Sequence, residues 1–327
     1  MVAATAGLAS AIHERVLLVT TLFVTHPSSL EHDAGPGHPE RPDRIRAIER
    51  AFEHERFQAL HRALAPGLVR EALLRVHPAN YVKAIEAAAP AEGRSRLDAD
   101  TVMSPGTWDA LSHGVGGAVA AVDEVMRGAV KNAFVAVRPP GHHAETARPM
   151  GFCFFNFVAV AARHAQAAHG AERVAIVDFD VHHGNGTQEI FWSDPTVLYA
   201  STHQMPLFPG TGAVDQRGEH DTIVNAPLSA GDDGLAFREA MTSRILPRIE
   251  AFVPDLIVIS AGFDAHRLDP LGGLNLVEPD FAWVTTRLME IAERRANGRI
   301  VSILEGGYDL DGLARSAAAH VSALMEA

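Results

Sequence analysis

Three short segments of the chain combine residue types that bind metal ions. They read Arg-Pro-Pro-Gly-His-His at 138–143, Asp-Phe-Asp-Val-His-His-Gly-Asn at 178–185, and Gly-Phe-Asp at 262–264. The middle segment follows the apolar run 174–177, which predicts a buried parallel strand. Because side chains alternate along an extended chain, Asp178, Asp180 and His182 are expected to share one face at the strand's end. Two carboxylates and an imidazole in that place are typical of a divalent metal site.

Asp180 and His182 from one loop and Asp264 from another would give three protein ligands. Three ligands leave room for water and substrate, which indicates a catalytic rather than a structural metal. Each residue taken alone is better explained as a helix cap or a buried polar group. The three together favour the metal site.

Two neighbouring histidines, His142 and His143, follow a Pro-Pro-Gly sequence that is typical of a rigid turn. An imidazole titrates in the range needed to take a proton from metal-activated water. Each ring needs an orienting partner, and Asp178 and Asn185 are available. A carboxylate would favour a charged ring, whereas a neutral amide would leave the ring's pKa lower. The alternative is a surface turn with both histidines solvated.

Aromatic side chains follow glycines in the same part of the sequence. Tyr308 comes after two glycines, where its phenol could donate a hydrogen bond to the oxyanion that forms when water attacks a carbonyl. Phe152 follows Gly151, and Phe208 lies in a second loop, so two rings could form a narrow apolar slot for an alkyl chain. Read singly, these residues are more typical of turns and cores.

The elements that must position these groups alternate along the chain. Apolar runs predict strands at 16–24, 133–137, 174–177, 197–201, 256–260 and 300–304. Alanine-rich segments predict helices at 108–127, 158–169, 235–252 and 281–296. This alternation predicts an α/β protein with a mostly parallel sheet covered on both faces. We expect one domain over 1–327, with 1–14 as a loose extension, and the motifs gathered beyond the carboxyl ends of the strands.

Composition excludes several classes of protein. The 327 residues carry 28 Lys+Arg and 40 Asp+Glu, a formal charge of −12 that disfavours direct nucleic-acid binding. Cys153 is the only cysteine, so an intrachain disulfide and a zinc-thiolate cluster are excluded. No apolar run is long enough to cross a membrane, and no signal peptide is recognisable at the N-terminus. These features favour a cytoplasmic protein.

Together, the motifs resemble the zinc-dependent histone deacetylase family, in particular its class II branch with bacterial deacetylase and acetylpolyamine amidohydrolase relatives. The segments that carry the resemblance are 38–42, 138–144, 151–156, 178–188, 260–264, 269–273 and 305–308. The resemblance implies a single-domain arginase–deacetylase fold, with a central eight-stranded parallel sheet and helices on both faces. It also implies zinc-dependent hydrolysis of an acyl-lysine amide by metal-activated water.

The resemblance also assigns roles to single positions. The implied metal ligands are Asp180, His182 and Asp264. The implied catalytic residues are His143 as general base, His142 as its electrostatic partner, Asp178 and Asn185 as the partners that orient them, and Tyr308 as the group that polarises the carbonyl. The implied substrate-binding residues are Gly151, Phe152 and Phe208 in the tunnel walls, Gly306 beside Tyr308, and a loop acid at Asp98 or Asp100, with Asp98 preferred.

The implied cofactors are one catalytic Zn²⁺, with Fe²⁺ as an alternative, and one or two structural K⁺ ions. The first K⁺ site would involve Asp178, Asp180, His182 and Ser201, and the second the backbone around Phe191, Asp194 and Val197.

Leu271 bears on the substrate. Polyamine-selective relatives carry a glutamate at this position, so an apolar residue favours an acyl-lysine peptide or protein over an acylated small amine. An acetylpolyamine amidohydrolase remains the alternative, and a non-catalytic module that binds acylated peptides is a weaker one. The oligomeric state stays open.

Overall fold

A computed structural model describes residues 21–326 of the chain. Eight strands form one sheet in the order β2-β1-β5-β10-β9-β6-β7-β8, and every neighbouring pair is parallel. The strands are β1 (Thr21–Thr25), β2 (His61–Leu64), β5 (Asn132–Ala136), β6 (Val174–Asp178), β7 (Val197–Gln204), β8 (Ile223–Leu228), β9 (Leu256–Ala261) and β10 (Ile300–Leu304). The parallel eight-stranded sheet implied by the family resemblance is therefore confirmed.

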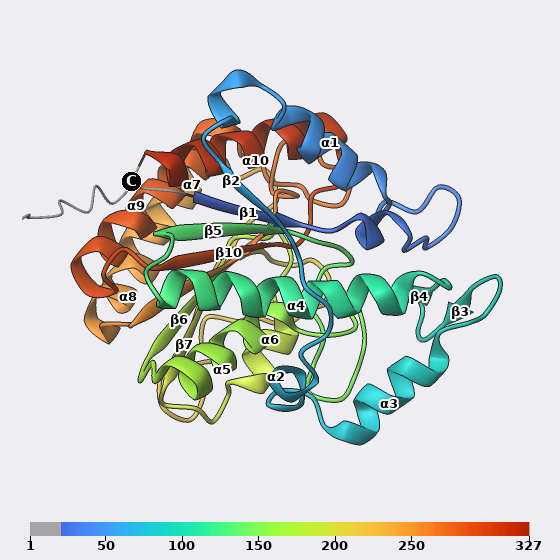
Figure 1. Cartoon of the computed structure of the whole chain (residues 1–327). Coiled ribbons are helices and arrows are strands. Elements are labelled where there is room, and N and C mark those ends of the chain that lie inside the picture. Colours follow the sequence, from blue (N-terminus) through green and yellow to red (C-terminus); the bar gives the residue numbers. More distant parts are fainter. Residues whose placement is uncertain (1–20, 327) are drawn as a thin grey trace, which may run out of the picture.

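Helices cover both faces of this sheet (Figure 1). One face packs against α4 (Thr107–Met126) and α5 (Phe157–His169), and the other against α1 (Asp43–Ala51), α9 (Glu278–Arg295) and α10 (Leu310–Met325). The shorter helical segments are η1 (Pro27–Leu30), η2 (Glu55–Phe57), α2 (Arg70–Leu74), α3 (Ala79–Ala88), α6 (Asn185–Ile190), α7 (Gly234–Ala240), the π-helical η3 (Met241–Ile245) and α8 (Leu246–Phe252). A small antiparallel pair, β3 (Ser95–Arg96) and β4 (Val102–Met103), stands apart from the main sheet.

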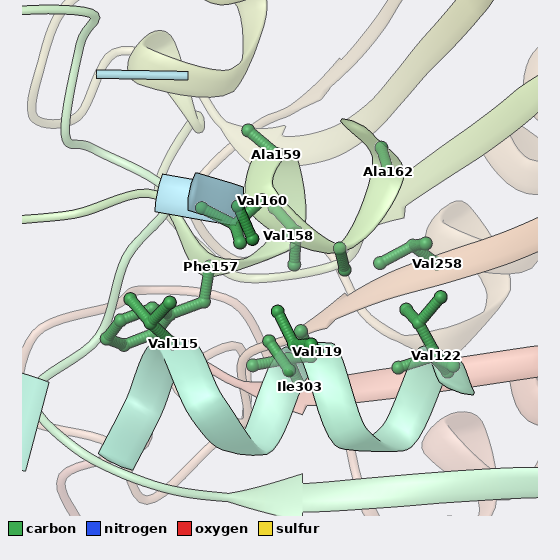
Figure 2. Close-up of a cluster of buried hydrophobic side chains, with 14 of the residues drawn as sticks. Val115, Val119, Val122, Phe157, Val158, Ala159, Val160, Ala162, Val258 and Ile303 are labelled. Carbon is green, nitrogen blue, oxygen red and sulfur yellow. The ribbon is translucent and has the colours of Figure 1, made fainter. Parts of the chain in front are cut away.

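Alternation along the strands divides the apolar side chains between two cores. In β6, Val174 and Ile176 belong to the core on the α4–α5 side, whereas Ala175 and Val177 belong to the core on the opposite side. Figure 2 shows the first core, in which valines of α4 face apolar side chains of α5, with Val258 of β9 beside them. A strand buried on both faces needs apolar residues at every position, which is why these runs were recognisable in the sequence.

Local signals fix the ends of α5, the helix that follows the Gly-Phe segment of the site. The side chain of Asn156 accepts a hydrogen bond from the backbone N–H of Ala159 at 3.0 Å and so caps the first turn. Gly170 ends the helix in a left-handed conformation with φ of 68°. The loop before Asn156 therefore enters the helix at a defined point.

Two strands of the main sheet were missed because they do not read as apolar runs. The edge strand β2 is largely exposed, and the opposite edge strand β8 contains Asn225 and Pro227. Proline is tolerated at a sheet edge, where a missing N–H breaks no ladder. The helix predicted over 235–252 is divided into α7, η3 and α8, and Pro247 lies in the first turn of the last of these.

Two predictions extend outside the described residues. These are the start of the strand predicted at 16–24 and the extension at 1–14. The single-domain organisation over 1–327 stays a prediction. Within residues 21–326, no helix is both long and apolar enough to cross a membrane.

Candidate active site

The predicted metal-binding and catalytic residues lie at or beyond the carboxyl ends of four neighbouring strands, β5, β10, β9 and β6. The histidine pair follows β5, Tyr308 follows β10, Asp264 follows β9, and Asp180 with His182 follows β6. Parallel strands bring these loops to one edge of the sheet.

Asp180, His182 and Asp264 converge on one another. Nδ1 of His182 lies 3.1 Å from Oδ1 of Asp180 and 3.1 Å from Oδ2 of Asp264. All three residues are buried, and one ligand atom from each falls within 4.8 Å of the other two. Ligand atoms of a tetrahedral site with bonds of about 2.0–2.2 Å stand roughly 3.3–3.6 Å apart, so this donor set fits a zinc-sized ion.

Backbone N–H groups orient the two carboxylates. Asp180 Oδ2 accepts from the N–H of Gly306 at 2.8 Å, and Asp264 Oδ1 accepts from the N–H of Val181 at 2.9 Å. A Cβ on Gly306 would lie 2.1 Å from Asp264 Oδ2, so only glycine allows this close approach. Each carboxylate thus accepts a hydrogen bond from a neighbouring loop through one oxygen and directs the other oxygen at Nδ1 of His182.

The predicted alternation along a strand does not extend to Asp180 and His182. β6 ends at Asp178, and Asp180 and His182 lie in the loop that follows it. In this loop, Asp178 Oδ1 accepts the N–H of Asp180 at 3.1 Å, and Asp180 Oδ1 accepts the N–H of His182 at 2.9 Å. Successive aspartate-to-backbone hydrogen bonds, rather than the pleat of a strand, set the directions of these side chains.

The electrostatics of the cluster favour a bound cation. Burial disfavours the charged form of Asp264, and with the neighbouring carboxylate of Asp180 it raises the pKa of Asp264 to about 7. Burial also lowers the pKa of His182, but the two carboxylates outweigh this and raise that pKa to about 10. Two buried carboxylates beside a single imidazole leave an excess of negative charge that a divalent ion would neutralise.

The histidine pair has two different partners. Nδ1 of His142 lies 3.0 Å from Oδ2 of Asp178, and Nδ1 of His143 lies 2.9 Å from Oδ1 of Asn185. Burial lowers the pKa of His142, but Asp178 and other nearby carboxylates raise it well above its usual value. Burial and the adjacent His142 hold the pKa of His143 well below its usual value. The two rings, 4.1 Å apart, are therefore tuned in opposite directions.

A cavity of about 270 Å³ opens beside the cluster and is lined by Asp100, His143, Gly151, Phe152, His182, Leu207, Phe208, Leu271 and Tyr308. Phe152 packs edge-on against Tyr308, with ring centroids 5.9 Å apart, and Phe208 packs against His143 at 5.1 Å. A Cβ on Gly151 would lie 2.4 Å from Cδ2 of His143, so glycine is required where the wall meets this ring. The cavity thus has apolar walls and a polar end.

Two predicted substrate-binding residues lie elsewhere. Asp100, not Asp98, lines the cavity, and its Oδ1 accepts the N–H of Gly151 at 3.2 Å. Oδ1 of Asp98 accepts the N–H groups of Asp100 at 3.0 Å and of Thr101 at 2.7 Å, which shapes the turn that presents Asp100. Gly306 lies next to the carboxylates of Asp180 and Asp264 and is not part of the cavity lining.

A buried carboxylate that had no predicted role connects the loops. Glu305 Oε2 accepts the N–H of Gly141 at 2.6 Å and the N–H of His142 at 3.0 Å. It therefore ties the loop of Tyr308 to the histidine pair. Its place in the Glu-Gly-Gly-Tyr motif was the only sequence signal for this function.

A buried arginine of α1 binds the backbone of the loop that carries Tyr308. Arg44 donates through Nε to the carbonyl of Gly307 at 2.6 Å, and its guanidinium lies 4.9 Å from the centre of the Tyr308 ring. Glu40 neutralises Arg44 at 3.2 Å and also binds Arg138 through two bonds of 2.6 Å. These long-range contacts fix the Tyr308 loop against α1.

Comparison with known proteins identifies a single family. Residues 38–324 match the histone deacetylase domain family. A histone deacetylase-like amidohydrolase of Pseudomonas aeruginosa is 41% identical over 280 residues, which is 84% of this chain and 73% of that protein. A probable deacetylase of Archaeoglobus fulgidus is 38% identical over 304 residues, 90% of this chain and 83% of that protein. The crystal structure of the HDA15 HD domain superimposes with a TM-score of 0.88 at 37% identity, covering 94% of this chain and 89% of that one.

Proposed function

Because the chain belongs to the histone deacetylase family, we propose that it removes acetyl or other acyl groups from the side-chain amine of acylated lysine in a peptide or protein. It is a hydrolase that acts on amides. The observation that carries the finer assignment is the buried Asp180–His182–Asp264 cluster beside a narrow cavity that also exposes His143 and Tyr308.

The proposed cofactor is Zn²⁺, with Fe²⁺ as an alternative, held by Asp180, His182 and Asp264. When bound there, such an ion would act as a Lewis acid towards the amide carbonyl and would make water more acidic. Structural K⁺ at one or two sites, near Ser201 and near Asp194, is part of the same proposal.

The two histidines divide the proton chemistry between them. His143 Nδ1 faces the amide oxygen of Asn185, so its Nε2 is the atom that accepts a proton from the attacking water and returns it to the leaving amine. His142, paired with the carboxylate of Asp178, holds its positive charge and stabilises negative charge that develops nearby.

Tyr308 supplies the second electrophilic group. Burial raises the pKa of its phenol well above the usual value, so the hydroxyl stays protonated and can donate to the developing oxyanion. The Gly307 carbonyl and the Tyr308 ring both rest on Arg44, which limits the movement of this donor.

The cavity walls favour an unbranched alkyl chain. Phe152, Phe208 and Leu271 present apolar surface around a cavity of about 270 Å³, which suits the four methylene groups of a lysine side chain. Leu271 offers no charge to the distal ammonium of a polyamine, which supports the acyl-lysine substrate over an acylpolyamine.

The test is hydrolysis of a fluorogenic N-acetyl-lysine peptide beside N-acetylspermidine, each with and without a metal chelator. We expect chelator-sensitive turnover that favours the peptide and returns when Zn²⁺ is added back. Preference for N-acetylspermidine would replace the lysine substrate by a polyamine. Chelator-insensitive turnover would overturn the metal mechanism. A series of longer acyl groups would distinguish another acyl preference from a non-catalytic binding protein.

A further inference from the structure

The two ends of the Asn185 side chain contact groups of opposite character. Its Oδ1 lies 2.9 Å from Nδ1 of His143. Its Nδ2 donates to Oε1 of Glu145 at 2.9 Å, with the sulfur of Met150 at 3.2 Å and the carbonyl oxygen of His143 at 3.4 Å. Asn185 is buried at the first position of α6.

These contacts allow only one orientation of the amide. Every neighbour of Nδ2 is an acceptor, and the nearest is the carboxylate of Glu145. If the amide rotated by half a turn, its oxygen would face the carboxylate and the carbonyl, and no donor would remain for Glu145. Glu145 therefore decides which end of Asn185 faces the histidine.

The orientation of Asn185 in turn decides the tautomer of His143. An amide oxygen accepts, so Nδ1 of His143 must carry the hydrogen, and its Nε2 keeps a free lone pair. This is the lone pair that a general base needs. With the amide reversed, Nδ1 would accept, Nε2 would carry the hydrogen, and the ring would have no basic atom facing the cavity.

Glu145 is itself held in place. Its backbone N–H donates to the carbonyl of Arg148 at 3.0 Å, and the next residue, Thr146, donates to Glu189 Oε2 of α6 through its N–H at 2.9 Å and its hydroxyl at 2.7 Å. The charged group near the carboxylate is Arg148, whose Nη1 lies 3.9 Å from Oε2. The loop of Glu145 and the helix of Asn185 thus form one fixed unit.

We infer that Glu145 is a positioning residue for the general base, acting on His143 through the amide of Asn185. Positions 145 and 185 form a coupled pair: a carboxylate at 145 requires an amide at 185, and a carboxylate at 185 would require a cation at 145. The inference rests on the proposed role of His143 in amide hydrolysis.

The coupling can be tested by exchanging the charges. In Glu145→Lys the ammonium attracts the amide oxygen and reverses Asn185, and in Asn185→Asp two carboxylates face each other. We expect each single variant to lower kcat/KM by about 10- to 100-fold, the usual effect of losing a partner that orients an essential histidine. The double variant, in which the introduced ammonium donates to the introduced carboxylate, should recover most of the loss. In the double variant, the acid side of the pH profile of kcat/KM should shift to higher pH, because a carboxylate now contacts His143 and raises its pKa.

Glu189→Lys is the matched control. It makes the same kind of change at the same loop–helix contact but touches Thr146 rather than Asn185. We expect it to leave the pH profile in place, and thermal melting of every variant verifies folding. Single variants that keep the parent kcat/KM and pH profile would overturn the inference. So would a double variant whose fold-loss of kcat/KM equals the product of the two single losses.

A readout independent of turnover separates this inference from the proposed function. The ¹⁵N shifts of the His143 ring report its tautomer, and a His143→Gln spectrum assigns the signals. We expect Nδ1–H in the parent protein and a shift towards Nε2–H in Glu145→Lys. Nδ1–H in both would contradict the role of Glu145 even if the enzyme is active. If the protein hydrolyses none of the acyl substrates but Glu145→Lys still shifts the His143 tautomer towards Nε2–H, the positioning role of Glu145 is supported and the proposed function fails.

Discussion

Within residues 21–326, aspartate and histidine side chains form three tight clusters, one in the candidate active site, one between α4 and α5, and one of His26, Asp109 and His113. The second contains Asp123 on α4 with His164 and His169 on α5. Its atoms are as close as those of the active-site cluster, since Nε2 of His164 and Nε2 of His169 lie 2.8 Å and 2.7 Å from the same oxygen of Asp123.

The cluster of Asp123 and the cluster of Asp180 differ in whether their nitrogen and oxygen atoms keep lone pairs that could bind a metal. Nη1 of Arg75 lies 3.1 Å from Nδ1 of His164, and because arginine only donates, Nε2 of His164 must carry the hydrogen that goes to Asp123. That nitrogen has no lone pair for a metal. In the active site, by contrast, carboxylate oxygens of Asp180 and Asp264 both face one nitrogen of His182.

The clusters also differ in charge and burial. The active site places two carboxylates and one imidazole in a buried pocket, whereas the cluster of Asp123, His164 and His169 has one carboxylate, two imidazoles and a nearby guanidinium, and is partly exposed. Excess buried negative charge favours a cation, and a carboxylate satisfied by two histidines does not. Free lone pairs and net charge, rather than residue types, therefore distinguish the proposed metal site from the cluster of Asp123, His164 and His169.

The largest expected effect comes from the same substitution made in each of these two clusters. Asp264→Asn removes a ligand charge and should eliminate metal binding, with a loss of turnover beyond the roughly 10²–10³-fold that follows loss of one oxyanion donor. Asp123→Asn should leave turnover of the acetyl-lysine peptide unchanged. Steady-state kinetics with metal analysis of both variants checks this, and equal losses of turnover would show that the distinction between the clusters is wrong.

The next largest effect should come from the phenol of Tyr308, beside the Asp180–His182–Asp264 cluster. Tyr308→Phe keeps the ring that packs against Phe152 but removes the hydroxyl. We expect kcat to fall roughly 10²–10³-fold with the metal content unchanged. Undiminished turnover in this variant would remove Tyr308 from the mechanism.

A smaller effect should follow from changing the orientation of the proposed ligands without substituting any of them. The methyl group of Gly306→Ala would collide with Asp264 Oδ2 at 2.1 Å. We expect metal affinity to fall about 10- to 100-fold, as for other changes that misorient ligands. Competition with a chromophoric chelator measures this, and an affinity equal to that of the parent protein would show that the Gly306 contact does not control the site.

The smallest effect should be on stability. Burial raises the pKa of Asp123, but hydrogen bonds from His169 and His164 outweigh this and lower it. Because the folded pKa is lowered, the contribution of Asp123 is present above the unfolded pKa and is lost as the pH falls through the folded value. We expect Asp123→Ala to reduce the free energy of unfolding by about 1 kcal/mol near neutral pH, with the difference shrinking in acid. Denaturant unfolding at several pH values would reveal a pH-independent difference if this explanation is wrong.

The sequence predicted that Asp180, His182 and Asp264 would lie together, but it did not predict how their side chains are oriented. These three residues were recognisable because carboxylate and imidazole side chains closely follow buried strands, and the carboxyl ends of parallel strands lie at one edge of the sheet. The alternation rule failed beyond Asp178, where β6 ends and backbone N–H groups take over the orientation of the carboxylates. Such hydrogen bonds leave no periodic signal.

Residues that hold the site together were harder to find for the same reason. Glu305 and Gly141 are 164 positions apart, and Glu145 and Asn185 are 40 apart. A carboxylate with a distant buried partner looks like any surface acid in the sequence. Asp98 and Asp100 show the limit at short range, since only the turn between them decides which one reaches the cavity.

The most direct test of the metal assignment is a Zn²⁺ titration of the metal-free protein, following bound metal and hydrolysis of the acetyl-lysine peptide together. We expect activity to rise from the baseline and to saturate at one tightly bound ion per chain, in the parent protein and in Asp123→Asn alike, with no activation in Asp264→Asn. Full activity without metal, or activation of Asp264→Asn equal to that of the parent protein, would contradict it.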